Sequence, residues 1–398
     1  SQLESNGLIA LQSKNADIDL QGTTYAQTQT ILAQKNLNIA ADASVTTVGN
    51  LNITADTLNN TGMVNTQQLT KAQLKKLNNQ GSLISDKFEL STLESVNNSG
   101  KLISNQDLEL KTAALTNTHN SILAGNSNLN LYINGADFNN QGVISAMSSL
   151  VLDAAQINTV NNGSMSAGNQ LNIDTQMLDN AGKLNATAIN INASDVNNSA
   201  NIVGSTVKIN TDKKVDSAIV NSGEIYAANQ ADLTVSDKID NTGYIYTVNN
   251  QNTGAVNLTA QQLLNGNEGI ISTNNLLLKT DEIVNAGQIS ADSAVIEGKT
   301  SLQTAFTNIG KSLSNTGMYL YNSLTAKNLS SLNNSGDLYV NLNASDSLSE
   351  ISAADLINNS GAYLYLGNNA SFNQTGLVSK NAGEIYVQSN DVAPLATS

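Results

Sequence analysis

Cysteine is absent from this chain of 398 residues, which excludes disulfides, thiol chemistry and cysteine-based zinc sites. The absence fits a protein that crosses a membrane as an extended polymer, because a disulfide closed on the way would form a loop too wide to thread. Proline occurs once, at Pro394, and tryptophan does not occur. The single histidine, His119, excludes a multi-histidine metal site and a catalytic triad that relies on histidine.

Charge and long apolar runs are also scarce. Charged residues make up 13% of the chain, the formal net charge is −14 and the pI is near 4.4, so a basic surface for nucleic acid is not expected. A run of about 18 apolar residues, which a transmembrane helix needs, does not occur. Residues 1–4 lack the features of a secretion signal, so we expect either a cytosolic protein or an interior part of a longer one.

A repeated unit organises the sequence, and residues 96–115, VNNSGKLISNQDLELKTAAL, are a clear copy. An apolar residue, asparagines and a small polar residue precede Gly100, which predicts a tight corner where glycine adopts positive φ. Two runs of alternating apolar and polar residues follow, and this period is typical of strands with one buried face. The unit therefore predicts three short strands around three corners. The side chains expected to share its interior are Leu102, Leu108, Leu110 and Leu115.

Copies of this unit recur at intervals of about 20 residues without a helical pattern, which predicts an all-β solenoid. The corner positions are Gly62, Gly81, Gly100, Gly142, Gly163, Gly182, Gly223, Gly243, Gly269, Gly287, Gly317, Gly336, Gly361 and Gly376, with His119 and Ala200 as substitutes. An apolar residue stands two places after most corners, as at Val64, Leu83 and Val378. Such a column is buried only when coils stack, because each coil covers its neighbours.

Asparagines before the corners predict a ladder of side-chain amides that holds the register of the coils. The predicted members are Asn60, Asn79, Asn98, Asn140, Asn162, Asn180, Asn198, Asn241, Asn334 and Asn359. We divide the chain into divergent coils with a weak corner at Gly7 (1–50), regular repeats (51–243), coils with longer loops and a tyrosine-rich face (244–390), and a tail (391–398). The extra length around residues 249–254, 300–311 and 344–351 forms loops or part of an additional coil.

The segments LNNQGSLIS, VNNSGKLIS, LDNAGKLNA and IDNTGYIYT resemble the filamentous-haemagglutinin repeats of bacterial two-partner-secretion exoproteins, and the likeness covers roughly residues 50–390. The resemblance implies a right-handed parallel β-helix that is exported through an outer-membrane transporter partner and folds outside the cell. Members of the family include adhesins, haemolysins and the stick proteins of contact-dependent growth inhibition. Because neither the secretion domain nor a toxin domain of that family is recognisable, the resemblance implies an interior fragment.

Candidate catalytic groups are few. Some parallel β-helices process polysaccharides with clustered acids, and the available carboxylate pairs are Asp17 with Asp19 and Asp281 with Glu282. They lie near expected turns without arginine, so we interpret them as solvated surface, and His119 as a left-handed turn residue. The sequence predicts no catalytic residue, cofactor or metal site.

Tyrosine is distributed unevenly, since most of the 11 tyrosines follow a glycine in the second half of the chain. The candidate partner-binding residues are Tyr226, Tyr244, Tyr246, Tyr319, Tyr321, Tyr339, Tyr363, Tyr365 and Tyr386. Alternation places Leu320 and Leu364 inward and these tyrosines outward along one side. One interpretation is an aromatic ladder that stabilises an outer face, and the other is a partner-binding strip.

These patterns favour a non-enzymatic stalk or adhesive segment of a secreted bacterial cell-surface exoprotein, with a target-cell receptor or glycan as its partner. We expect a monomeric rod that binds no nucleic acid and does not insert into a membrane. A glycan-processing β-helix enzyme is the alternative, and a stalk without any binding role is a third interpretation.

Overall fold

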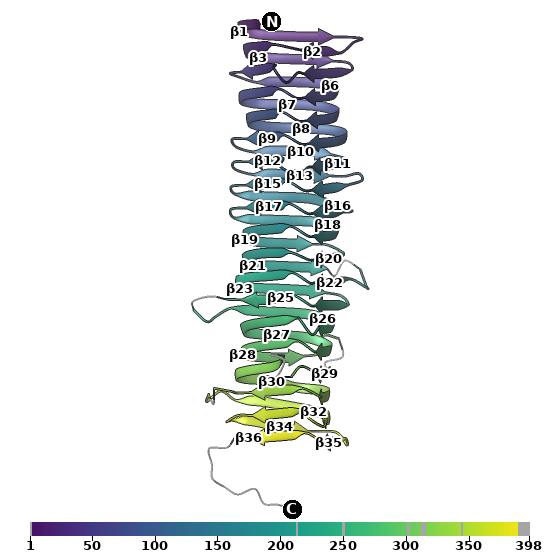
Figure 1. Cartoon of the computed structure of the whole chain (residues 1–398), viewed down its shortest axis with the longest axis vertical. Helices are drawn as coiled ribbons and strands as arrows, with labels where there is room; N and C mark the ends of the chain where they lie inside the picture. The colour runs from purple at the N-terminus through teal and green to yellow at the C-terminus, as the bar shows by residue number, and fades with distance from the viewer. Residues whose placement is uncertain are drawn as a thin grey trace, which may run out of the picture. The chain divides into compact units, whose positions relative to one another are not determined.

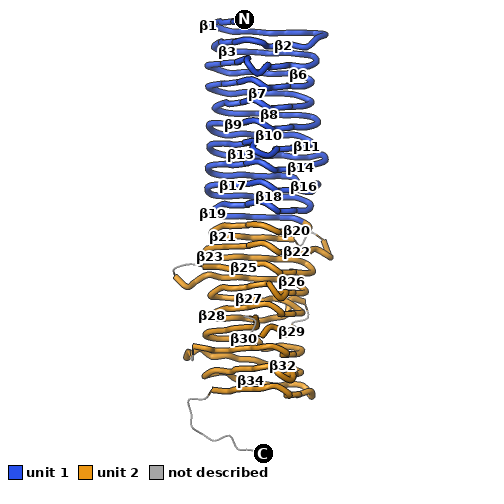
Figure 2. The backbone as a smooth tube through the Cα atoms, in the orientation of Figure 1, with its two compact units in different colours: residues 1–193 blue, residues 194–398 orange. Residues whose placement is uncertain are grey.

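The computed structural model describes residues 2–211, 214–248, 251–300, 303–311, 316–343 and 345–388. These residues form strands and turns, without a helix among them, and neighbouring strands pair in parallel, as β8 does with β9. The asparagines of successive coils lie 19 to 26 residues apart. The predicted all-β parallel solenoid is therefore confirmed. The chain divides into two compact units, residues 1–193 and 194–398 (Figure 2).

The first unit stacks short strands along the chain (Figure 1). Its strands are β1 (Gln2–Ser13), β2 (Ile18–Leu20), β3 (Thr23–Ala33), β4 (Asn36–Ile39), β5 (Ser44–Thr47), β6 (Leu51–Asn60), β7 (Met63–Asn79), β8 (Ser82–Asn98), β9 (Lys101–Ser104), β10 (Leu108–Thr112), β11 (Ala114–Asn117), β12 (Ile122–Gly125), β13 (Leu129–Ile133), β14 (Phe138–Asn140), β15 (Val143–Ala146), β16 (Ser149–Asn161), β17 (Ser164–Ala167), β18 (Gln170–Asn180) and β19 (Lys183–Asn192).

The second unit is built in the same way. Its strands are β20 (Asp195–Asn198), β21 (Asn201–Thr211), β22 (Ala218–Asn221), β23 (Glu224–Val235), β24 (Lys238–Asn241), β25 (Tyr244–Thr247), β26 (Ala255–Asn265), β27 (Ile270–Asn285), β28 (Gln288–Glu297), β29 (Thr304–Asn308), β30 (Gly317–Asn334), β31 (Asp337–Val340), β32 (Ser349–Asn358), β33 (Tyr363–Leu366), β34 (Ala370–Gln374), β35 (Ser379–Asn381) and β36 (Glu384–Val387).

The coil of residues 101–117 shows how the repeat folds. Its strands β9, β10 and β11 are separated by corners, as the alternating pattern predicts. Leu102 pairs with Leu83 of the coil before and with Leu123 of the coil after. The four leucines expected inside, Leu102, Leu108, Leu110 and Leu115, are all fully buried. Stacking therefore buries a column that no single coil could cover.

The corner glycines are required for a different reason from the one the sequence suggests. Among the described glycines only Gly317 and Gly361 have positive φ, so the predicted left-handed corner at Gly100 is wrong. A Cβ on Gly100 would lie 2.1 Å from the carbonyl oxygen of Gly81, and a Cβ on Gly81 would lie 2.1 Å from that of Gly62. Glycine is needed because the backbones of successive corners approach too closely for any side chain.

The predicted asparagine ladder is present inside both units. Asn98 is fully buried, accepts a hydrogen bond from Asn79 Nδ2 at 2.7 Å and donates to Asn117 Oδ1 at 2.8 Å. The ladder runs through Asn60, Asn79, Asn98, Asn117, Asn140, Asn161 and Asn180 in the first unit. In the second unit it runs through Asn198, Asn221, Asn241, Asn265, Asn285, Asn308, Asn334, Asn358 and Asn381.

Neighbouring asparagines explain two wrong ladder assignments. Asn161 and Asn358 hold the buried positions that were assigned to Asn162 and Asn359. In a pair of adjacent asparagines only one side chain faces inward, because strand residues alternate between the two faces. Asn359 instead donates to Asn333 Oδ1 at 2.8 Å.

Two of the predicted corners are misplaced. The amide of Gly310 donates to Asn285 O and that of Gly383 to Asn358 O, so these glycines, not Gly317 and Gly376, follow the ladder asparagines. Val378 is consequently 45% exposed and lies outside the buried column. Its place in register is taken by Ile385, which pairs with Leu364.

Other local predictions need correction. Gly7 lies within β1, at a register shift between Ser5 and Leu8, and forms no corner. His119 is exposed, and the left-handed conformation belongs to its neighbour Asn120, with φ of 65°.

The predicted longer loops fall partly outside the described residues, namely at residues 249–250, 301–302 and 344, as does the tail from residue 391 onward. Within the predicted loop of residues 300–311, Thr304–Asn308 form β29, which pairs with β27 and β30. β29 ends at the ladder residue Asn308 and belongs to the same coil as β28, so these residues do not form an additional coil.

Candidate functional site

The candidate tyrosines lie on the outer side of the strands that follow the asparagine corners. Tyr226 pairs with Tyr246, and Tyr319, Tyr339, Tyr365 and Tyr386 pair in succession. The inward neighbours Leu320 and Leu364 are buried, which confirms the predicted alternation. We call the outward side of these strands in the second unit the tyrosine face. Its role in binding stays a prediction.

The rings on the tyrosine face stack from coil to coil. The ring centroids of Tyr319 and Tyr339 lie 5.3 Å apart with planes at 9°, and those of Tyr365 and Tyr386 lie 5.4 Å apart with planes at 8°. Tyr339 and Tyr365 connect the two pairs at 6.1 Å with a tilt of 40°. Parallel strands are spaced about 4.8 Å apart, so in-register pairing alone brings the rings into contact.

The remaining candidates lie beside this ladder. Tyr363 packs against Tyr339 at 5.4 Å, and burial raises the pKa of Tyr363 above its ordinary value. Burial raises the pKa of Tyr319 as well, and the nearby Tyr339 raises it by a smaller amount. Tyr321 lies two residues after Tyr319 on β30, on the same outward side, and is exposed. The equivalent column of the first unit is mixed and includes one tyrosine. In register it runs through Tyr25, Thr46, Asn65, Ile84, Ile103, Ala124, Ser145, Ser166 and Asn185.

Two serines separate the tyrosines into two groups. Along the register, Tyr246 pairs with Ser272, Ser272 with Ser290, and Ser290 with Tyr319. Small side chains therefore stand where the aromatic column is interrupted. The first group consists of Tyr226, Tyr244 and Tyr246, of which Tyr244 and Tyr246 line a pocket.

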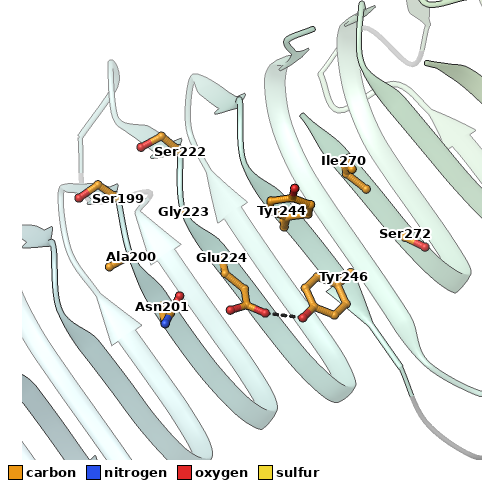
Figure 3. A pocket seen from close by; sticks show the side chains of 10 residues that line it. All are labelled: Ser199, Ala200, Asn201, Ser222, Gly223, Glu224, Tyr244, Tyr246, Ile270 and Ser272. Atoms are coloured by element: carbon orange, nitrogen blue, oxygen red, sulfur yellow. Dashed lines mark hydrogen bonds between the residues drawn. The ribbon is translucent and has the colours of Figure 1, made fainter. Parts of the chain in front are cut away.

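This pocket has a volume of about 630 Å³ and opens on the tyrosine face of the second unit (Figure 3). Ala200 and Gly223 at two corners contribute small groups to its lining, and Tyr244 and Ile270 contribute apolar surface. Tyr244 is 51% exposed, so its ring is accessible to a ligand. The parallel register brings Glu224 directly opposite Tyr244.

One hydrogen bond holds the carboxylate of Glu224 in the pocket. The hydroxyl of Tyr246 donates to Glu224 Oε1 (Figure 3), and the Tyr246 ring lies 5.0 Å from that of Tyr226. The hydrogen bond to Glu224, together with burial, raises the pKa of Tyr246 to about 12. The carboxylate is therefore held in place by a phenol and not by a basic side chain.

We expect the Tyr246 phenol to lose its proton only near pH 12, because deprotonation gives up the hydrogen bond to Glu224 and places two negative charges together. Ultraviolet difference titration of the wild type against Tyr246→Phe should isolate this late transition. A folded-state pKa above the unfolded value of about 10 stabilises the protein below that pH, and the contribution disappears as pH rises from about 10 to 12.

Glu224→Gln is the matched control for this titration. It keeps the side-chain length but removes the charge, so the Tyr246 transition should move toward its ordinary range. A Tyr246 transition near pH 10 in the wild type, or one unchanged by Glu224→Gln, would contradict the assignment.

The other sequence candidates have structural partners. Asp17 accepts hydrogen bonds from the backbone and side chain of Asn36, and Asp281 accepts from the backbone of Lys299 at 2.8 Å. The side chains named as possible acids thus connect neighbouring coils and do not converge on one groove.

Comparison with protein-family models, curated proteins and solved structures gives no match for this chain. Within the described residues, no three histidine or acidic side chains are grouped so that they could hold a metal ion. The same residues include no helix long and apolar enough to cross a membrane.

Sequence reasoning named Tyr244 and Tyr246 but missed the pocket that they border. Glu224 belongs to the previous coil, and only the register of β23 with β25 shows that it faces these tyrosines. The recurrence of GEIY and GYIY at residues 223–226 and 243–246 is the one signal that could have indicated this pairing.

Proposed function

We propose that this chain is a non-enzymatic stalk and adhesive segment of a secreted bacterial cell-surface exoprotein of the filamentous-haemagglutinin-repeat type. In this proposal the chain is exported through an outer-membrane transporter partner, and its tyrosine face contacts a receptor or glycan of a target cell. The resemblance of the repeats to that family is the reason for the proposed location.

The adhesive part of the proposal rests on the second group of tyrosines, which stack from coil to coil through Tyr319, Tyr339, Tyr365 and Tyr386. Tyrosine gives a large contact area with few rotatable bonds, so ordering it in a complex costs little entropy. Stacking further restricts Tyr339 and Tyr365 before a partner arrives. A rigid row of partly exposed aromatic rings on a parallel scaffold suits an extended partner better than a small substrate.

Replacing Tyr319, Tyr321, Tyr363 and Tyr365 together with serine should weaken binding to target cells by at least about tenfold, because aromatic anchors dominate protein interfaces. Binding of the labelled segment to a panel of bacterial and animal cells, measured by flow cytometry, tests this result.

A Tyr132→Ser variant is the control, since Tyr132 lies in the first unit on β13 and pairs with Lys111 and Asp153, outside the column of the tyrosine face. Circular dichroism must show that each variant keeps its β signal, because cross-strand aromatic pairs also stabilise a sheet by about 0.2–1 kcal/mol each. Unchanged cell binding by a folded quadruple variant would refute the adhesive role and leave only the stalk.

A further inference from the structure

The pocket beside Tyr244 carries a negative charge that no basic side chain among the described residues neutralises. Of the two Glu224 oxygens, Oε1 accepts from the Tyr246 hydroxyl, and in the described part of the chain neither has a basic partner. The described residues that line the pocket include no lysine or histidine. A formal net charge of −14 for the whole chain adds a field of the same sign.

Aromatic surface surrounds this carboxylate. Tyr244 lies opposite Glu224 in register, and Tyr246 lies on the same coil as Tyr244, beside Tyr226. The face of an aromatic ring carries negative electrostatic potential, so it attracts a cation placed over it. A carboxylate and exposed tyrosine rings therefore favour the same kind of ligand.

The other groups that line the pocket favour an organic cation over a metal ion. A metal ion needs several oxygen ligands, whereas Glu224 is the one carboxylate among the residues that line the pocket. Ile270 and Ala200 offer apolar surface on which the methylene stem of a long basic side chain can pack while its charged end reaches the carboxylate. A neutral sugar would use the rings but gain nothing from the charge.

We propose that this pocket binds a lysine or arginine side chain of a partner protein, with its cationic group between Glu224 and the ring of Tyr244. The inference names the partner chemistry of one part of the tyrosine face and rests on the proposed adhesive function for its biological meaning. None of Tyr319, Tyr321, Tyr363 and Tyr365 lines the pocket, which lies on strands β21, β23, β25 and β27 and on the corners before β21 and β23, so the two proposals can fail separately.

The test compares two blocked tripeptides, Gly-Lys-Gly and Gly-norleucine-Gly, which differ in charge but hardly in shape. Binding to the whole chain, labelled with ¹³C in its tyrosine rings, is followed by the shifts of the ring signals. The lysine peptide should perturb the Tyr244 signal and bind at least about tenfold more tightly than the norleucine peptide, with an advantage that falls as salt screens the charge.

Variants then locate the binding site. Glu224→Gln and Tyr244→Leu should each weaken lysine-peptide binding by about fivefold to tenfold, whereas Tyr244→Phe should retain it because the ring face is kept. Asp153→Asn is the charge-matched control: it removes one negative charge from an exposed site on β16 of the first unit, so it should leave binding unchanged.

Several results would overturn the proposal. Equal binding of the two peptides by the wild type would do so without any variant, as would equal effects of Asp153→Asn and Glu224→Gln. Binding of a neutral trisaccharide that depends on Tyr244 but not on Glu224 would replace the basic side chain with a glycan. Loss of cell binding by the quadruple tyrosine variant alongside a negative peptide result would preserve the adhesive function and reject only this pocket.

Discussion

Gly81→Ala lowers the free energy of unfolding of the first unit by at least about 3 kcal/mol, or prevents its folding, because overpacking against rigid backbone cannot relax by a change of rotamer. The added Cβ would lie 2.1 Å from the carbonyl oxygen of Gly62 and 2.7 Å from the carbonyl carbon of Thr61. Relief would require the two coils to separate, which weakens the hydrogen bond from the Gly81 amide to Asn60 O. Urea denaturation followed by circular dichroism measures the loss.

Gly7→Ala is the matched control for this experiment. A Cβ at Gly7 would have Ser5 Oγ at 3.8 Å as its one neighbour within 4 Å, and Gly7 has no positive φ. Alanine there should be neutral or should stabilise by about 0.4–1 kcal/mol through the unfolded state. Similar denaturation midpoints for the two variants would show that close approach does not determine the corner residue.

Asn98→Asp should destabilise the first unit by about 3–5 kcal/mol at neutral pH, because it places an uncompensated charge in a buried site. The amide of Asn98 donates to Asn117 Oδ1 and to the carbonyl oxygen of Ile122. An ionised carboxylate has no proton to donate and faces both oxygens. Chemical denaturation at pH 7 measures the difference from the wild type.

The pH dependence of this variant gives a second test. Burial raises the pKa of the introduced carboxyl above its unfolded value of about 3.9, so the penalty is least below about pH 4 and grows as pH rises through the folded-state pKa. Asn97→Asp, one residue away, is the control, because Asn97 is exposed and its side-chain amide donates a hydrogen bond to Asn78 Oδ1. An equal loss in the free energy of unfolding for both variants would show that burial of the ladder residue does not cause the destabilisation.

The regular part of the fold could be predicted from the sequence because one pattern repeats the same constraint many times. Each apolar residue two places after a corner faces inward, and alternation then assigns the next residues, as it did for Leu102 and Leu108. Errors arose where the pattern offered two equivalent candidates, such as Asn161 and Asn162. Only the pairing of Asn161 with Asn180 decides between them.

The physical reason for the corner glycine could not be read from the sequence. A turn that needs positive φ and a corner that approaches another backbone both select glycine, and the residue type does not distinguish them. Gly317 illustrates the difficulty, since it does have positive φ yet does not follow a ladder asparagine. Only the distance between one coil and the next separates the two causes.

The candidate site could be predicted only in part, because the sequence pattern describes single strands and not the pairing between them. Alternation was enough to place Tyr226 and Tyr246 on the outer side, because it concerns one strand at a time. The pocket depends on the register between strands, which brings Glu224 to Tyr244, and on the small groups at Ala200 and Gly223. Register is set by stacking, so side chains from successive coils cannot be matched before the coil lengths are known.

The constant spacing of 19 residues in the ladder from Asn60 to Asn117 has a consequence for how such a chain evolves. Asn60, Asn79 and Asn98 are each separated by 19 residues, so recombination between the gene segments that encode these copies adds or removes a whole coil. Every inward column and amide ladder continues across the new junction. The length of the unit therefore changes in steps of about 4.8 Å, and each intermediate gene encodes a chain that still folds.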